Sequence, residues 1–138
     1  MASASNGNAL TDAAVTDILK RYLGVTPDLG ALATGNCSIL LTATTPDEDG
    51  TTTTVSNAEA ATDEEFAVTV TNNTATNADA VSIVIPSGTT SIAGFYIANP
   101  DGDKVFSGVF GSAITVTPGD TVQFAVGDID ITLDGTRT

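Results

Sequence analysis

The forty residues from Gly94 to Leu133 constrain most strongly what this chain can fold into. Apolar and polar residues alternate along them, as in Val122-Gln123-Phe124, and clusters of Asn, Pro, Gly and Asp interrupt the alternation at 99–103 and 117–120. Runs with a period of two, bounded by such turn residues, are typical of short antiparallel strands. This stretch therefore predicts a β-meander or sandwich, and none of its residues stands out as a catalyst.

Three further apolar runs lie upstream and predict strands at 38–44, 66–70 and 81–85, and a fourth, at 92–98, leads into this stretch. The first run is apolar on both faces at Ile39-Leu40-Leu41, which indicates a central strand. The long polar segment 45–65 between the first two runs predicts an exposed loop. We expect a mainly β chain, an antiparallel β-sandwich of about eight strands with one N-terminal helix.

The helix is expected from about Thr11 to Leu23. Thr11 or Asp12 supplies a side-chain oxygen for the N-cap, and Gly24 supplies the left-handed residue at the other end. Apolar residues recur at helical spacing between these limits: Ala14, Val15, Ile18, Leu19, Tyr22 and Leu23. We expect this stripe to pack on the sheet.

Residues 1–10 predict a flexible N-terminal arm, and residues 11–138 a single helix-plus-sandwich domain. The arm lacks the basic region and the apolar core of a signal peptide, so we expect assembly in a cytoplasm. No apolar run approaches membrane-spanning length, and we expect no membrane partner.

The chain carries a formal net charge of -13, with only four basic residues. Attachment to nucleic acid needs clusters of Lys and Arg, so we expect no nucleic-acid partner. An acidic surface suits solubility, a salty medium or docking onto a basic partner.

Composition also argues against catalysis. The chain has no His, which excludes every His-dependent triad and zinc site, and it has no glycine-rich phosphate loop. Asp128 and Asp130 share a strand face, and a glycosidase needs two facing carboxylates, but this face alternates with Ile129 and Ile131 and predicts a solvated surface. Cys37 is the only cysteine, and its apolar neighbourhood favours an inert buried thiol. We expect no enzymatic activity.

Two acidic turns are candidate calcium ligands, Asp47-Glu48-Asp49 and Asp101-Gly102-Asp103. Calcium prefers clustered carboxylate and carbonyl oxygens, although Asp is also a frequent turn former because it bonds its own backbone. The sequence leaves both explanations open, and we expect no cofactor other than an optional structural calcium ion.

The run 92–98 is apolar on both faces, with Tyr96 on the same face as Ile92. Such a strand is either central in a two-layer core or partly covered by a partner, and Tyr combines an apolar ring with a polar tip. The sequence therefore allows Tyr96 to lie either in the core or in a contact with a partner.

Both ends of the chain resemble small virion proteins of tailed bacteriophages. The similarity covers Leu10 to Leu19 and the closing motif from Val116 to Leu133, in which Pro118 departs from the pattern. It also includes a T-x-P-x-x-x-G turn, here Thr44 to Gly50, and an aromatic residue after glycine, here Gly94-Phe95.

The resemblance implies a structural capsid decoration or cement protein on the outer surface of a bacteriophage virion. Its partners would be the major capsid protein or other virion proteins, with self-association on the particle as a further option. The residues expected to bind the partner are Ala2, Ser3, Ala4, Ser5, Asn6, Leu10 and Tyr96. The alternative is an adhesive module associated with the phage tail or fibre, which binds a host-surface glycan or protein.

Overall fold

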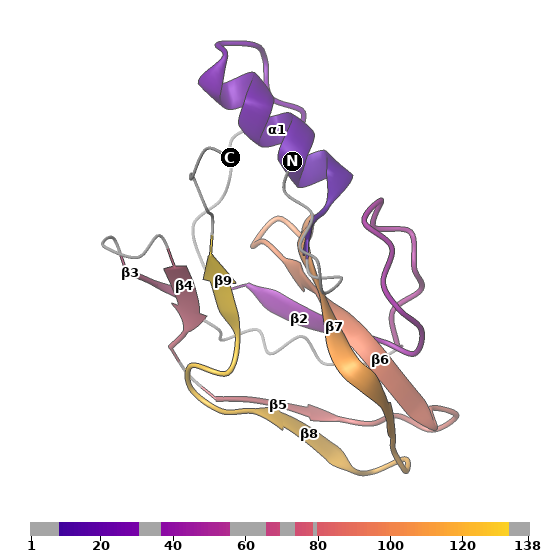
Figure 1. The fold of residues 1–138 in the computed structure, drawn as a ribbon. Coiled ribbons are helices and arrows are strands. Elements are labelled where there is room, and N and C mark those ends of the chain that lie inside the picture. Colours follow the sequence, from indigo (N-terminus) through magenta and orange to yellow (C-terminus); the bar gives the residue numbers. More distant parts are fainter. Residues whose placement is uncertain (1–8, 31–36, 56–65, 70–73, 79, 133–138) are drawn as a thin grey trace.

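The computed structural model describes residues 9–30, 37–55, 66–69, 74–78 and 80–132. Within them the chain forms one helix and nine strands (Figure 1). In chain order these are β1 (Ala9–Leu10), α1 (Asp12–Tyr22), β2 (Ser38–Thr42), β3 (Phe66–Thr69), β4 (Thr74–Asn77), β5 (Val81–Val84), β6 (Ser91–Ala98), β7 (Lys104–Thr115), β8 (Thr121–Phe124) and β9 (Asp130–Thr132).

The strands form two antiparallel layers. One layer is a four-stranded sheet with the order β1-β7-β6-β2. The other consists of a three-stranded sheet, β3-β4-β9, and the pair β5-β8. β4 is followed along the chain by β5, and β8 is followed by β9. Because β4 pairs with β9 and β5 pairs with β8, the two pairs continue one another, with an interruption between Thr74↔Thr132 and Val81↔Phe124.

Asn77 bridges that interruption. Its side-chain oxygen accepts a hydrogen bond from the amide of Ile129 at 3.0 Å, and its side-chain nitrogen donates to the carbonyl of Ala125 at 2.9 Å. Its carbonyl also accepts from the amide of Gly127 at 3.2 Å. A fully buried Asn with these partners holds the loop between β8 and β9 against the end of β4.

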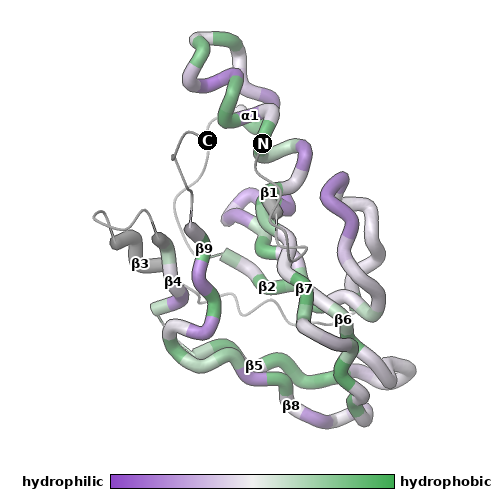
Figure 2. The backbone as a smooth tube through the Cα atoms, in the orientation of Figure 1, coloured by the Kyte–Doolittle hydropathy of each residue, from purple (hydrophilic) through white to green (hydrophobic). Residues whose placement is uncertain are grey.

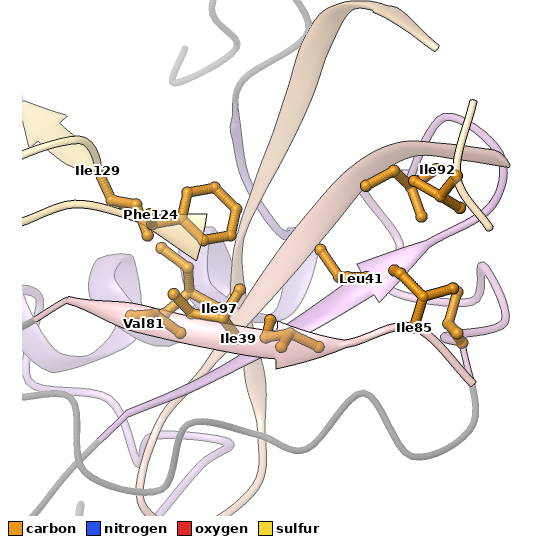
Figure 3. Packing of buried hydrophobic residues seen from close by; sticks show 11 residues of the cluster. Ile39, Leu41, Val81, Ile85, Ile92, Ile97, Phe124 and Ile129 are labelled. Atoms are coloured by element: carbon orange, nitrogen blue, oxygen red, sulfur yellow. The ribbon is translucent and has the colours of Figure 1, made fainter. Parts of the chain in front are cut away.

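The hydrophobic core lies between the two layers. On β5, Val81 and Ile83 point inward and are buried, whereas Ser82 and Val84 point outward. Val81 and Ile83 belong to one buried cluster with Ile39 and Leu41 of β2, and Figure 3 labels Val81, Ile39 and Leu41 among the side chains of this cluster. The buried members of the cluster are Ile39, Leu41, Val55, Val81, Ile83, Ile85, Ile92, Ile97, Val116, Phe124 and Ile129.

The predicted class, an antiparallel mainly β fold with an N-terminal helix, is confirmed. β4 escaped the sequence analysis because its residues, Thr-Ala-Thr-Asn, show no apolar alternation. The prediction that β2 is central was wrong, because among the described strands β2 lies at the edge of its sheet, next to β6. Outside this sheet, Thr42 of β2 forms an isolated antiparallel bridge with Thr54.

The predicted boundary of the arm also needs correction. Ala9 and Leu10 form β1, which pairs with Ser107 and Phe106 of β7, and the side chain of Leu10 is buried. The folded body therefore includes Ala9 and Leu10, which the prediction had assigned to the arm.

The limits of the helix match the prediction. The Oγ1 atom of Thr11 accepts a hydrogen bond from the amide of Ala14, as an N-cap does. At the other end Gly24 has a φ of 74°, and the amides of Gly24 and Val25 donate to the carbonyls of Arg21 and Lys20. This pair of hydrogen bonds is the Schellman motif.

The predicted packing of the stripe was wrong for its C-terminal half, although Val15 and Ile18 in its N-terminal half are half-buried. Ala14 and Asp17 are the buried residues of α1, whereas Leu19, Tyr22 and Leu23 are exposed. The helix is fixed to the β body at its N-terminal end, where the amide of Thr11 donates to the carbonyl of Val105 at 3.0 Å. From there α1 extends to the end of the molecule opposite β5 and β8 (Figure 1), and Figure 2 shows apolar stretches along it in green.

Candidate functional site

Tyr96 does not lie on the surface. Its side chain is 0 % exposed on β6, and its hydroxyl donates to the carbonyl of Asp47 at 2.6 Å. The ammonium group of Lys104 lies 4.7 Å from the centre of the ring. The prediction that Tyr96 and Leu10 contact a partner is therefore wrong for this structure, because both side chains are buried within the chain. Ala2, Ser3, Ala4, Ser5 and Asn6 lie outside the described residues.

The acidic turn around Asp47 is attached to the body at three points. Besides the Tyr96 hydroxyl, the ammonium of Lys104 donates to the carbonyl of Gly50 at 2.9 Å. The amide of Asp12, at the start of α1, donates to the carbonyl of Glu48 at 2.8 Å. These contacts hold the turn next to the first residues of the helix.

The candidate calcium ligands serve as turn-forming groups. The carboxylate of Asp49 accepts from both the amide and the hydroxyl of Thr51, and these hydrogen bonds lower its pKa below the ordinary value. In the second turn, the side chain of Asn99 accepts from the amides of Asp101 and Asp103. The described residues contain no group of three acidic, His or Cys side chains placed to hold a metal ion. A structural calcium ion stays a prediction.

Asp128 and Asp130 have separate surroundings. The carboxylate of Asp128 accepts from the amide of Ala125 and stabilises the turn before β9, while Asp130 is exposed on β9 itself. Cys37 is half-buried, and burial raises the pKa of its thiol. A raised pKa leaves less of the nucleophilic thiolate at neutral pH.

The motifs of the resemblance fall on residues that shape the body. A Cβ atom on Gly94 would lie 2.3 Å from the carbonyl oxygen of Gly108 and 2.6 Å from the ring of Pro46, so only glycine fits there. Pro46 of the T-x-P-x-x-x-G turn is thus packed on the Gly94-Phe95 motif.

The glycine and aspartate of the closing motif also have structural roles. The amide of Asp120 donates to the carbonyl of Thr117 at 2.9 Å, and Gly119 has a φ of 93°, as a type II turn requires. The same turn makes two hydrogen bonds with the backbone of Ile85. The amide of Gly119 donates to the carbonyl of Ile85, and the amide of Ile85 donates to the carbonyl of Asp120.

A surface that the sequence analysis missed lies on the outer side of α1. Leu19, Tyr22, Leu23 and Val25 are 56, 87, 75 and 53 % exposed, and we refer to these four residues as the helix face. They account for four of the seven large apolar residues that are exposed in the described part of the chain. The signal was present in the sequence as the helical stripe, but periodicity does not tell what covers a stripe.

Another side of α1 carries Asp17, Lys20 and Arg21, of which Asp17 is buried and the two basic residues are half-buried. Asp17 is 3 % exposed and pairs with Arg21 one turn later, and its Oδ1 atom accepts from the amide of Leu29 at 2.9 Å. Arg21 also donates to the carbonyl of Gly30, and Lys20 pairs with Asp28. The loop after the helix therefore lies along the charged side of α1.

These contacts set the ionisation of Asp17. Burial opposes its charge, but the hydrogen bonds from Arg21 and Leu29 outweigh burial and lower the pKa of Asp17 below its ordinary value. An ionised Asp17 thus links helix and loop and keeps the helix face directed outward.

A shallow hollow lies beside the acidic turn. Most of the residues that line it are threonines, and the full lining consists of Ala43, Thr44, Asp47, Thr51, Thr52, Thr53, Thr54, Val55 and Thr89. Its lining offers hydrogen-bonding groups for a polar ligand but no aromatic ring on which a sugar would stack.

Comparisons with protein-family models, with curated proteins and with solved structures found no match. The resemblance to phage virion proteins therefore rests on the sequence motifs. Among the described residues, no helix has the length and apolar character needed to cross a membrane.

Proposed function

We propose that this protein is a non-enzymatic structural protein of a bacteriophage virion that decorates the outer surface of the major capsid protein shell. The observation that carries the proposal is the role of its most characteristic residues. Gly94, Pro46 and the turn 117–120 shape the body, and none of them presents a reactive group. A chain whose motif residues build a scaffold is suited to presenting surfaces.

Charge supports an outer position. With a net charge of -13, the protein would be repelled by packaged DNA on the inner side of a shell. Asp47, Glu48 and Asp49 are exposed on a turn that is tied to the body, so they offer a fixed acidic patch for basic residues of the shell. Attachment through such a patch weakens as salt concentration rises.

The arm remains the proposed anchor, without Ala9 and Leu10, which pair with β7. Residues 1–8 are joined to the body at β1, where Leu10 is buried. Removal of Leu10 would leave a gap in the body, so the deletion that tests the anchor must end before Ala9.

The test uses particles that assemble with the full chain, with a variant lacking residues 2–8, or with a variant in which a Gly/Ser segment of equal length replaces them. We expect all three proteins to melt at the same temperature, and only the full chain to occupy capsids at its normal copy number. Normal occupancy by the deletion variant would show that the arm is not the anchor. Immunolabelling that finds the full chain on neither head nor tail would contradict the virion assignment.

The second candidate function is an adhesive module of the phage tail or fibre that binds a host-surface glycan or protein. The hydroxyl-rich hollow between Ala43 and Thr89 favours it, since sugars are bound through hydrogen bonds. Labelling confined to the tail, together with glycan binding that Thr53→Val and Thr89→Val abolish, would favour this candidate over decoration.

A further inference from the structure

We propose that the helix face of α1 is a self-association site, on which a second copy of this chain packs its own α1 in an antiparallel, two-fold symmetric pair. The proposal concerns the protein in solution and does not depend on its attachment to a virion.

The first observation is the inverted arrangement of α1. A surface helix normally turns its apolar stripe to the body and its charges to water. Here Asp17 is buried against Arg21 and Leu29, while Tyr22 and Leu23 are among the most exposed apolar residues of the described chain. The Schellman motif and the ion pairs keep the helix and its loop in this orientation, so the helix face cannot turn inward without breaking them.

The second observation is the spacing of the apolar residues. Within α1, Val15, Leu19 and Tyr22 follow one another at intervals of four and three residues; Val15 is half-buried, and Leu19 and Tyr22 are exposed. This is the spacing of a seam between two packed helices, and a two-fold axis makes such a seam complementary to itself.

The third observation is the distribution of charge. Residues 12–30 contain three Asp, one Lys and one Arg, a net charge of -1, whereas the whole chain carries -13. Lys20 and Arg21 are already paired with Asp28 and Asp17, so the segment offers little net charge to attract a basic or an acidic partner. A second copy presents the same low charge together with the matching apolar seam.

Charge also decides the orientation of the pair. α1 leaves the acidic body at its N-terminal end, so antiparallel packing places the two bodies at opposite ends of the helix pair. Eleven residues of helix span about 16 Å at about 1.5 Å per residue. This separation is about twice the Debye length of about 8 Å at physiological ionic strength, so the repulsion between bodies is largely screened.

The exposed area indicates a weak pair. Four side chains of this size and exposure present on the order of 500 Å², which is the size of the largest apolar patch on a typical monomer. Two helix faces would bury about 1,000 Å², at the low end for specific interfaces. We therefore expect dissociation constants in the micromolar range or weaker.

Sedimentation equilibrium of the full chain from micromolar to millimolar concentration tests the proposal, with two double variants of equal added charge. Leu19→Lys/Leu23→Lys changes the helix face. Val84→Lys/Val126→Lys is the matched control, because Val84 and Val126 are 55 and 63 % exposed and lie on β5 and on the turn after β8.

We expect the unaltered chain and the control to form dimers with rising concentration, and the helix-face variant to associate at least tenfold more weakly. Raising the salt concentration should strengthen or preserve dimer formation, the opposite of its expected effect on capsid attachment. A chain that stays monomeric up to millimolar concentration, or a helix-face variant that dimerises like the control, would overturn the proposal. Loss of capsid binding with intact dimers would instead contradict only the proposed function.

Discussion

The interior of the β-sandwich and the outer side of α1 carry apolar residues with equally regular spacing, but they differ in what covers them. On β5 and β2 the regular positions are buried between two layers, with Ile39 and Ile83 both 0 % exposed. On α1 the positions Leu19 and Tyr22 remain in contact with solvent. The difference teaches that a periodic pattern predicts a face, whereas the charges around that face decide whether it packs within the chain.

The largest expected effect is the difference in the free energy of unfolding between truncating a side chain to Ala in the core and truncating one on the helix face. Ile83→Ala should lower the free energy of unfolding by about 2–5 kcal/mol, because it leaves a cavity among β2, β5 and β6. Leu23→Ala should change it by less than about 0.5 kcal/mol, because its side chain has little packing to lose in the monomer. Urea unfolding at low protein concentration measures both. Similar losses for the two variants would mean that the helix face is covered within the monomer.

The next effect concerns two glycines of the four-stranded sheet, Gly94 on β6 and Gly111 on β7. Gly94→Ala should destabilise the protein by about 1–3 kcal/mol, because the new methyl group would collide with the carbonyl of Gly108 and with Pro46. Gly111→Ala on β7 is the control, since nothing lies within 4 Å of a Cβ atom there. Thermal melting compares them, and equal melting temperatures for the two variants would contradict the close packing of the acidic turn on β6.

A smaller effect is expected from the hydroxyl of Tyr96. Tyr96→Phe removes the hydrogen bond to the carbonyl of Asp47 and should cost about 0.5–1.5 kcal/mol. Amide hydrogen exchange should become faster in the turn 47–50 and stay unchanged at Asn77. Exchange that is unaltered in the turn would show that the contacts of Lys104 and Asp12 suffice to hold it.

The smallest effect is the acid titration of Asp17. Its pKa in the folded protein lies below the ordinary value of about 3.9, so the ionised group stabilises the fold above that pH. This contribution is lost as the pH falls from about 3.9 through the lowered pKa of the folded state.

Carboxyl NMR should place the midpoint of Asp17 below 3.9, and the amide of Leu29 should shift with the same midpoint. Asp17→Asn should abolish that titration of the Leu29 amide. A Leu29 amide that titrates unchanged in Asp17→Asn would contradict the link between helix and loop.

The sequence predicted the elements whose signals are local. Alternation located β5, β6 and β8, and capping residues located both ends of α1. It missed β4, which is held by pairing with β3 and β9 rather than by apolar side chains. It also placed Tyr96 and Leu10 among the partner contacts, because strand register, which buries both, is set by residues distant in the chain.

The helix face was the least predictable part of the candidate site. The stripe itself is plain in the sequence, but its exposure depends on the partners of Asp17, and these include Leu29, twelve residues further along. No local sequence pattern predicts a hydrogen bond between residues so far apart in the chain. The acidic turns, in contrast, were predictable as turns, since Asp49 in the first turn and Asn99 in the second bond nearby backbone amides through their side chains, as Asp and Asn commonly do.

The two tyrosines of the chain provide the most direct test of the central claim that α1 turns its apolar side outward. Tyr22 is 87 % exposed on the helix face and Tyr96 is 0 % exposed in the body. Photo-CIDNP NMR polarises only tyrosine rings that a dye in solution can reach, and no Trp or His competes in this chain. At micromolar concentration we predict one polarised tyrosine, Tyr22, whose signal weakens as the concentration rises and copies pair. A polarised Tyr96, or a Tyr22 that stays silent in the dilute monomer, would contradict the account.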